Sequence, residues 1–158
     1  MQYLSIENQK ALDQTFRVTV IIVLAFCFMP VLLIGAGYFI GAQGGAIRDI
    51  ETYLLVTKAS YGGALFAGLA VVALRRFWMT FLRGGKKTAA VVLNKLRLLA
   101  LLSSALGEIV AIIGFVAFSL SGDYQFCWRL GIVGLLLILY SFPRRWEWER
   151  TLATHAQA

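Results

Sequence analysis

The segment from Leu98 to Leu120 reads LLALLSSALGEIVAIIGFVAFSL, and it decides the fold. Its only charged residue, Glu108, lies close to the middle. About 20 apolar residues in a helix cross the hydrocarbon core of a bilayer, so this segment predicts a transmembrane helix. A carboxylate at that depth is costly to ionise, on the order of 2.5–3.5 kcal/mol on insertion scales. We therefore expect Glu108 to be protonated, paired or functional.

The composition of the whole chain is typical of a membrane protein. Of its 158 residues, 59% are hydrophobic and only 15% are charged, whereas a soluble domain has about 25% charged residues. The net charge is +7, but the basic residues flank apolar segments, which indicates membrane topology and anionic headgroups rather than nucleic acid. We predict a multi-pass protein of the bacterial cytoplasmic (inner) membrane that binds no nucleic acid.

Three further apolar segments accompany the central one, and together they predict an all-α bundle of four transmembrane helices. The expected spans are about 18–42, 53–74, 98–120 and 126–142. A polar or interfacial segment, residues 1–17, precedes them, and a cytoplasmic tail, residues 143–158, follows. Proline interrupts helices, so Pro30 is expected to kink the first span and Pro143 to stop the last one.

The positive charges predict which ends of the spans face the cytoplasm. Of the 15 Lys and Arg residues, only Arg48, Lys58 and Arg129 fall on one side, which leaves twelve on the other. Cytoplasmic loops carry the excess of Lys and Arg, so both termini and the middle loop are expected in the cytoplasm. Around that middle loop, the residues expected to contact lipid headgroups or a partner are Arg75, Arg76, Trp78, Arg83, Lys86 and Lys87.

Small residues on the spans predict where the helices meet. Gly, Ala and Ser let two helix backbones approach closely in lipid. In the central span such residues recur every three or four positions and therefore share one stripe of the helix. The residues expected at helix contacts are Gly37, Gly41, Gly63, Ala67, Ala100, Gly107, Ala111 and Gly114.

Glu108 lies at the edge of this stripe, one helical turn after Ser104. Two roles for the carboxyl group remain open. Glu108, with Ser104 beside it, binds a proton or a sodium ion, or it is a hydrogen-bonding contact between helices or subunits. Lys58 is a candidate counter-charge, although it is expected nearer the outer face of the membrane than Glu108.

The run GEIVAIIGFVAFSL, residues 107–120, resembles the ion-binding helix of the proteolipid subunits of vacuolar- and archaeal-type rotary ATPases. Those helices carry a Glu followed six residues later by a Gly, and Glu108 and Gly114 hold these positions here. The resemblance implies a ring-forming protein that carries protons or sodium ions on Glu108. In that family the Glu lies in the fourth span and the termini face outward. The layout as a whole more closely resembles small four-span bacterial membrane proteins, a likeness that implies no activity.

Residue types that bind metals or carry catalysis are sparse in this sequence. Cys27 and Cys127 are expected at different depths, and the single histidine, His155, lies in the polar tail. We therefore expect no metal site, no cofactor and no catalytic residue. The leading prediction is a small non-enzymatic protein, a structural or accessory subunit that packs within a larger membrane complex or with its own copies. The alternatives are a proton- or sodium-translocating protein that uses Glu108, and a small transporter.

Overall fold

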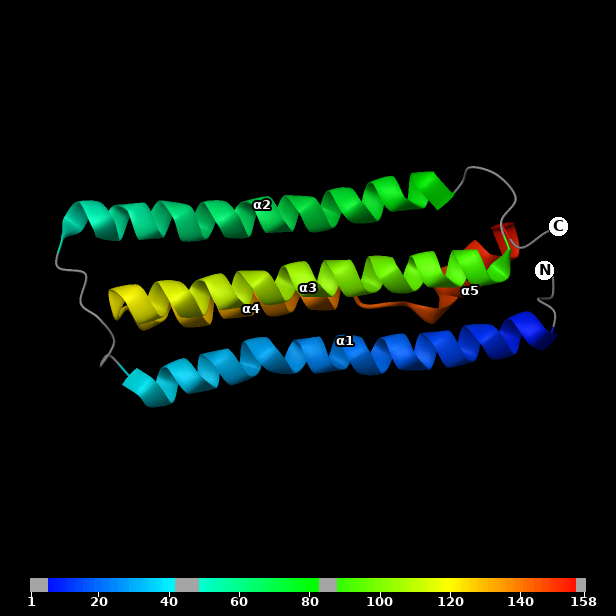
Figure 1. Ribbon diagram of the computed structural model, residues 1–158, viewed down its shortest axis with the longest axis horizontal. Helices are drawn as coiled ribbons and strands as arrows, with labels where there is room; N and C mark the ends of the chain where they lie inside the picture. Colours follow the sequence, from blue (N-terminus) through cyan, green and yellow to red (C-terminus); the bar gives the residue numbers. More distant parts are fainter. Residues whose placement is uncertain (1–5, 42–48, 83–87, 156–158) are drawn as a thin grey trace.

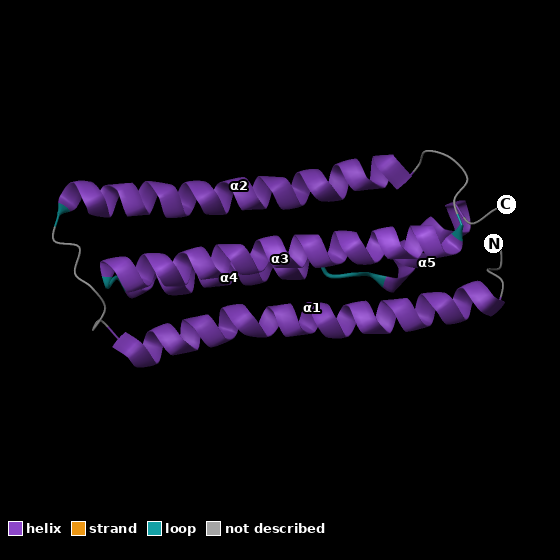
Figure 2. Cartoon of the chain, viewed as in Figure 1, coloured by secondary structure: helices purple, strands orange, loops and turns teal. Residues whose placement is uncertain are grey.

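The computed structural model of the protein describes residues 6–41, 49–82 and 88–155 (Figure 1, Figure 2). The helices of this described part are α1 (Ile6–Ile40), α2 (Ile50–Leu82), α3 (Ala89–Ser121), α4 (Tyr124–Tyr140) and α5 (Arg145–His155). None of the described residues belongs to a strand, so the prediction of an all-α fold is confirmed.

Three of the helices are longer than a membrane is thick. α1, α2 and α3 have 35, 33 and 33 residues, which at about 1.5 Å per residue is roughly 50 Å, whereas the hydrocarbon core measures about 30 Å. By length and composition these three qualify as membrane spans, and α4 with α5, bent by 42°, makes a fourth if the pair is counted as one span. The chain therefore has the architecture of a multi-pass membrane protein.

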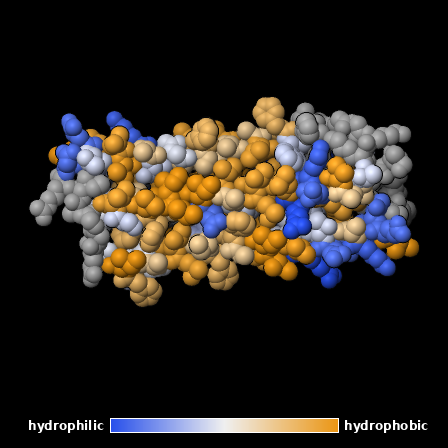
Figure 3. Space-filling view, viewed as in Figure 1, coloured by the Kyte–Doolittle hydropathy of each residue, from blue (hydrophilic) through white to orange (hydrophobic). Residues whose placement is uncertain are grey.

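The start of the chain belongs to the first long helix. The segment expected to be polar or interfacial, residues 1–17, is from Ile6 onward the first part of α1. Pro30 lies inside α1 and is buried, and the helix is continuous on both sides of it. On the face of the bundle seen in Figure 3, apolar side chains cover the middle, and hydrophilic side chains gather toward the end at which α5 lies.

α3 lies at the centre of the bundle. It packs against all four other helices, most extensively against α4, whereas α2 packs mainly against α3. In Figure 1, α1 and α2 flank α3 and α4 lies behind it. Twelve residues of α3 are buried, against five of α1 and six of α4. The apolar segment 98–120, which predicts a transmembrane helix from the sequence, thus belongs to the helix against which all the others pack.

A tight turn places α4 alongside α3. Gly122 ends α3 with φ of 73°, a left-handed conformation that favours glycine, and its N–H donates to the carbonyl oxygen of Phe118 over 2.7 Å. Asp123 then caps α4 by accepting from the backbone N–H of Gln125 over 2.9 Å. The hydroxyl of Tyr53 donates to Asp123 Oδ2 over 2.9 Å, which ties the start of α2 to the same turn.

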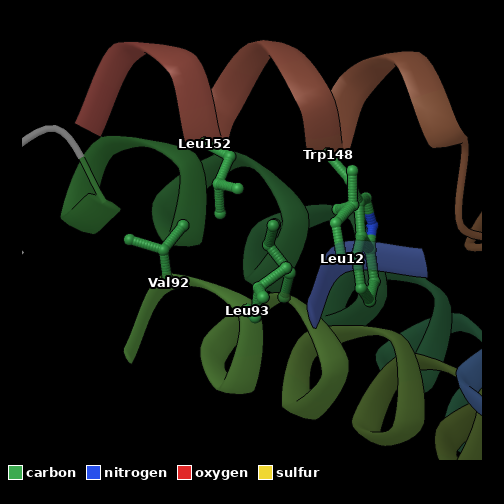
Figure 4. Packing of buried hydrophobic residues seen from close by; sticks show 6 residues of the cluster. Leu12, Val92, Leu93, Trp148 and Leu152 are labelled. Carbon is green, nitrogen blue, oxygen red and sulfur yellow. The ribbon is translucent and has the colours of Figure 1, made fainter. Parts of the chain in front are cut away.

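The opposite end of the bundle is covered by α5, and we call it the α5 end. Side chains of α1, α3 and α5 form one buried apolar cluster there (Figure 4): Leu12, Val92, Leu93, Leu96, Trp148 and Leu152. A helix of 11 residues is marginal on its own in water. Burial of Trp148 and Leu152 therefore holds α5, and the segment expected to be a polar tail, residues 143–158, contains a packed helix.

α4 is the shortest of the four helices α1 to α4. Its 17 residues extend about 25 Å, so α4 ends at Tyr140, before the level at which α1 and α3 reach the α5 end (Figure 2). Pro143 is buried in the non-helical connection and cannot donate a backbone hydrogen bond. The fourth expected span, 126–142, therefore ends as a helix two residues early. We call this connection, residues 141–144, the α4–α5 break.

Candidate functional site

α3 and α4 meet at glycines, where their backbones come closest. A Cβ atom added to Gly134 would collide with the carbonyl oxygen of Gly107 and lie 3.1 Å from the backbone nitrogen of Ala111. A Cβ on Gly114 would lie 2.6 Å from the Cβ of Leu130. Three expected packing residues, Gly107, Ala111 and Gly114, thus lie at the α3–α4 contact. Gly134 was not among the expected packing residues, although it lies three residues after another glycine of α4, Gly131.

The other expected packing residues from α1 to α3 lie at several separate contacts. Ala100 is buried in a cluster with Val23 and Ile138. From α2, Ala67 is buried beside Val110.

Two glycines on different helices lie close to side chains of a neighbouring helix. A Cβ on Gly63 would lie 3.4 Å from Ile113 Cδ1. A Cβ on Gly37 would lie 2.8 Å from Cys127 Sγ, which places Gly37 at the contact between α1 and α4.

Gly41 does not pack against another helix as expected. Its φ is 62°, in the left-handed region that favours glycine. No described atom lies within 4 Å of a Cβ built on it. Gly41 follows the last residue of α1. A glycine suits this position because it adopts the left-handed conformation easily, and not because another helix lies close to it.

Glu108 lies half-buried in the middle of α3. Ser104, one turn earlier, is fully buried, and its hydroxyl donates to the carbonyl oxygen of Ala100 over 2.8 Å. Within the described part of the chain, no hydrogen bond or ion pair engages the Glu108 side chain. Glu108 and Ser104 are therefore neighbours on one helix, but they do not form a hydrogen-bonded pair.

Lys58 lies too far along the bundle to neutralise Glu108. The hydrogen bond between Tyr53 and Asp123 marks a common level on α2 and the α3–α4 turn. From that level, at about 1.5 Å per residue, Lys58 lies about 7 Å and Glu108 about 22 Å into the bundle. Lys58 is also exposed on α2. The candidate counter-charge is thus displaced by roughly 15 Å in depth.

Arg75, expected to contact lipid headgroups or a partner, binds residues on both sides of the α4–α5 break. Its Nη2 lies 3.1 Å from each carboxylate oxygen of Glu147. Its Nη1 donates to the carbonyl oxygen of Tyr140, and its guanidinium group lies over the Tyr140 ring, 5.0 Å from the centroid. Arg75 therefore joins α2 to both sides of the break.

The remaining residues of that expected set have different surroundings. Trp78 packs against the buried cluster of the α5 end, and its indole N–H has no hydrogen-bond partner among the described residues. Arg76 is exposed on α2. Arg83, Lys86 and Lys87 lie outside the described residues.

A half-enclosed pocket of about 400 Å³ lies between α3 and the α4–α5 break. One part of its wall is apolar and includes Leu99, Phe142 and Trp146. The polar residues of the wall are Arg75, Ser103, Ser141, Glu147, Arg150, Thr151 and Thr154. The pocket was not predicted from the sequence. Pro143, which was expected to stop the last span, is the only residue that indicated a break in the helix there.

The described residues hold no group of three or more His, Cys, Asp or Glu side chains that could bind a metal ion. No protein-family model, curated protein or solved structure matches the chain. The resemblance of residues 107–120 to the proteolipid helix therefore stays a prediction. The function of the chain is inferred from the chemistry of its own residues.

Proposed function

We propose that the chain is a non-enzymatic subunit of a membrane assembly, built either with other proteins or with its own copies. The observation that carries this proposal is the position of Glu108. It lies in the middle of an apolar helix, half-buried, and the described part of the chain provides no partner for its carboxyl group.

Ionisable residues inside a membrane almost always face a partner or a water-filled path because leaving them in lipid is costly. Two residues that follow Glu108 are exposed on the bundle surface: Ile112, one turn later on the same face of α3, and Ile109, next to it in the sequence. A protonated carboxyl group there can donate a hydrogen bond to a carbonyl oxygen of another helix, a common link between membrane helices. In this proposal, the helix of a second subunit covers Glu108.

The proposal includes four spans with both termini in the cytoplasm. α4, about 25 Å long, is the fourth span. The start of α1 and the whole of α5 lie at the same end of the bundle, which supports a common side for both termini (Figure 1). The twelve-to-three distribution of Lys and Arg supports the cytoplasm as that side. This orientation suits the cytoplasmic membrane of a bacterium.

The proposal is tested by the mass of the assembly extracted in a mild detergent. Glu108→Gln keeps the shape and the hydrogen-bonding groups of a neutral carboxyl group, so this variant should assemble almost as the wild type does. Glu108→Ala removes the hydrogen bond and should shift the protein toward a single chain. Val72→Ala, a truncation at an exposed position on α2, is the control and should keep the assembly. Single chains in all variants and in the wild type would contradict the proposal.

A second candidate function is the translocation of protons or sodium ions on Glu108. The same observation favours it, because a half-buried carboxyl group without a protein partner is free to take up an ion. Purified protein in liposomes would then carry a proton or sodium flux that Glu108→Gln abolishes while the assembly persists. Absence of flux in the wild type would eliminate this candidate.

A further inference from the structure

In the proposed four-span arrangement, the α4–α5 break falls within the membrane or at its surface, and a cavity lies beside it. Backbone that leaves a helix at that depth is tolerated only where protein buries it or where it lines a cavity. Here Arg75 donates to the carbonyl oxygen of Tyr140, and the hydroxyl of Ser141 donates to that of Leu137 over 2.7 Å. The carbonyl groups at the end of α4 are thus bound by side chains, and the connection that follows them lines the 400 Å³ pocket.

Ser103 brings a hydroxyl group to the wall of this pocket. Its residue is only 2% exposed, and no described residue hydrogen-bonds to its side chain. The other wall hydroxyls are engaged on their own helices, for example Thr151 with the carbonyl oxygen of Glu147 and Thr154 with that of Arg150. A hydroxyl group that lines a pocket and has no protein partner can donate a hydrogen bond to a ligand atom there.

The pocket also carries an uncompensated positive charge. Arg75 and Glu147 pair with each other. Arg150 lines the pocket and forms no ion pair with any described residue. An anionic group is therefore the ligand that these side chains favour, and a guanidinium group is well suited to bind phosphate oxygens.

The position and the apolar wall of the pocket point to an amphiphile. Its α3 residues, from Leu96 to Ser103, span the passage from the charged start of α3 into the apolar segment. The volume lies in the range of ligand sites, which is about 300–1,000 Å³. Basic pockets between helices at the membrane surface bind lipid headgroups. We propose that this pocket binds an anionic phosphate ester, supplied by a glycerophospholipid, through Arg150 and Ser103, with the lipid tail along Leu99 and Trp146.

The test measures retained lipid by native mass spectrometry of the full chain, released from nanodiscs of phosphatidylglycerol and phosphatidylcholine in equal parts. The wild type should retain phosphatidylglycerol preferentially. Arg150→Gln removes a charge-assisted contact and should lower this retention about ten-fold. Ser103→Ala, nearly isosteric, should lower it less, and Ser103→Leu should fill the pocket and abolish it. Arg144→Gln is the matched control: Arg144 is exposed on the break, lies outside the pocket wall and makes only a long contact of 4.0 Å with Glu147, so the change should have little effect.

A second arm separates the two sources of phosphate ester. Glycerol phosphate, added to protein in detergent without lipid, should bind far more weakly than phosphatidylglycerol. If it binds as tightly, the lipid source is wrong. Equal retention of the two lipids by the wild type, or equal effects of Arg150→Gln and Arg144→Gln, would overturn the proposal.

Discussion

The guanidinium group of Arg75 on α2 binds both carboxylate oxygens of Glu147 on α5, with Nη2 3.1 Å from each. The same group donates to the carbonyl oxygen of Tyr140 at the end of α4. Both charged side chains are about three-quarters buried, at 24% and 25% exposure. One side chain thus fixes α2, α4 and α5 relative to one another at the break that forms the pocket.

Removal of this link should destabilise the protein more than removal of a surface ion pair. We expect Arg75→Gln to lower the free energy of unfolding by about 2 kcal/mol, because it leaves Glu147 and the Tyr140 carbonyl group without their charged donor. The control is Arg145→Gln, which breaks more exposed pairs with Asp13 and Glu149 and should cost less than about 1 kcal/mol. Thermal unfolding in detergent measures both. Equal losses would show that Arg75 is an ordinary surface contact.

The α3–α4 contact should tolerate no added methyl group. Gly134→Ala would push a Cβ into the carbonyl oxygen of Gly107, and overpacking of this kind costs about 1–3 kcal/mol. Gly62 on α2 has no described atom within 4 Å of a built Cβ. Gly62→Ala should therefore be neutral or slightly stabilising, as the higher helix propensity of Ala predicts. A similar loss in melting temperature for both variants would place the contact elsewhere.

The start of α2 should weaken in acid. Asp49 accepts from the Thr52 hydroxyl over 2.8 Å and from the Thr52 backbone N–H over 3.1 Å. These bonds lower the pKa of the Asp49 carboxyl group. The largest effect comes from the Thr52 hydroxyl, followed by the backbone N–H groups of Thr52 and Glu51. A lowered pKa means that Asp49 stabilises the folded helix above its ordinary pKa, about 3.9, and loses this effect as the pH falls through the lower value. The protection of the Thr52 and Tyr53 amides against exchange, relative to the unfolded chain at the same pH, should fall there, and Asp49→Asn should remove the change.

The orientation of the chain can be read from cysteine labelling in intact cells. In a background that lacks Cys27 and Cys127, Glu51→Cys and Thr88→Cys place single thiols at exposed positions on opposite ends of the bundle. An impermeant maleimide applied from outside should label only the Glu51→Cys protein. Labelling of the Thr88→Cys protein instead would reverse the proposed topology.

Local sequence patterns predicted the features of this fold that depend on one helix. The apolar segment 98–120 predicted α3, and the small residues Gly107, Ala111 and Gly114 predicted a stripe that the structure places against α4. Gly41 was misread because glycine serves equally for close packing and for a left-handed helix end, and spacing does not separate these uses.

Features that depend on distant residues left little signal in the sequence. α5 has 11 mostly polar residues. Its two buried apolar side chains, Trp148 and Leu152, are recognisable as core residues only once α1 and α3 are known to pack against them. The pairing of Arg75 with Glu147 joins residues 72 positions apart. The pocket likewise forms because α4 stops short of the level at which α3 begins, a difference in helix length that hydropathy does not resolve.

The central claim, that a second subunit covers Glu108, is tested most directly by cross-linking in native membranes. Ile112→Cys, in a background lacking Cys27 and Cys127, places one exposed thiol a turn from Glu108. The control, Val72→Cys, places one on the exposed side of α2. Oxidation should cross-link the Ile112→Cys chain to a second copy, or a bifunctional thiol reagent should join it to a partner subunit, and the control should stay uncross-linked. The product should persist with Glu108→Gln and vanish with Glu108→Ala. No product from Ile112→Cys, or equal products from both positions, would contradict the account.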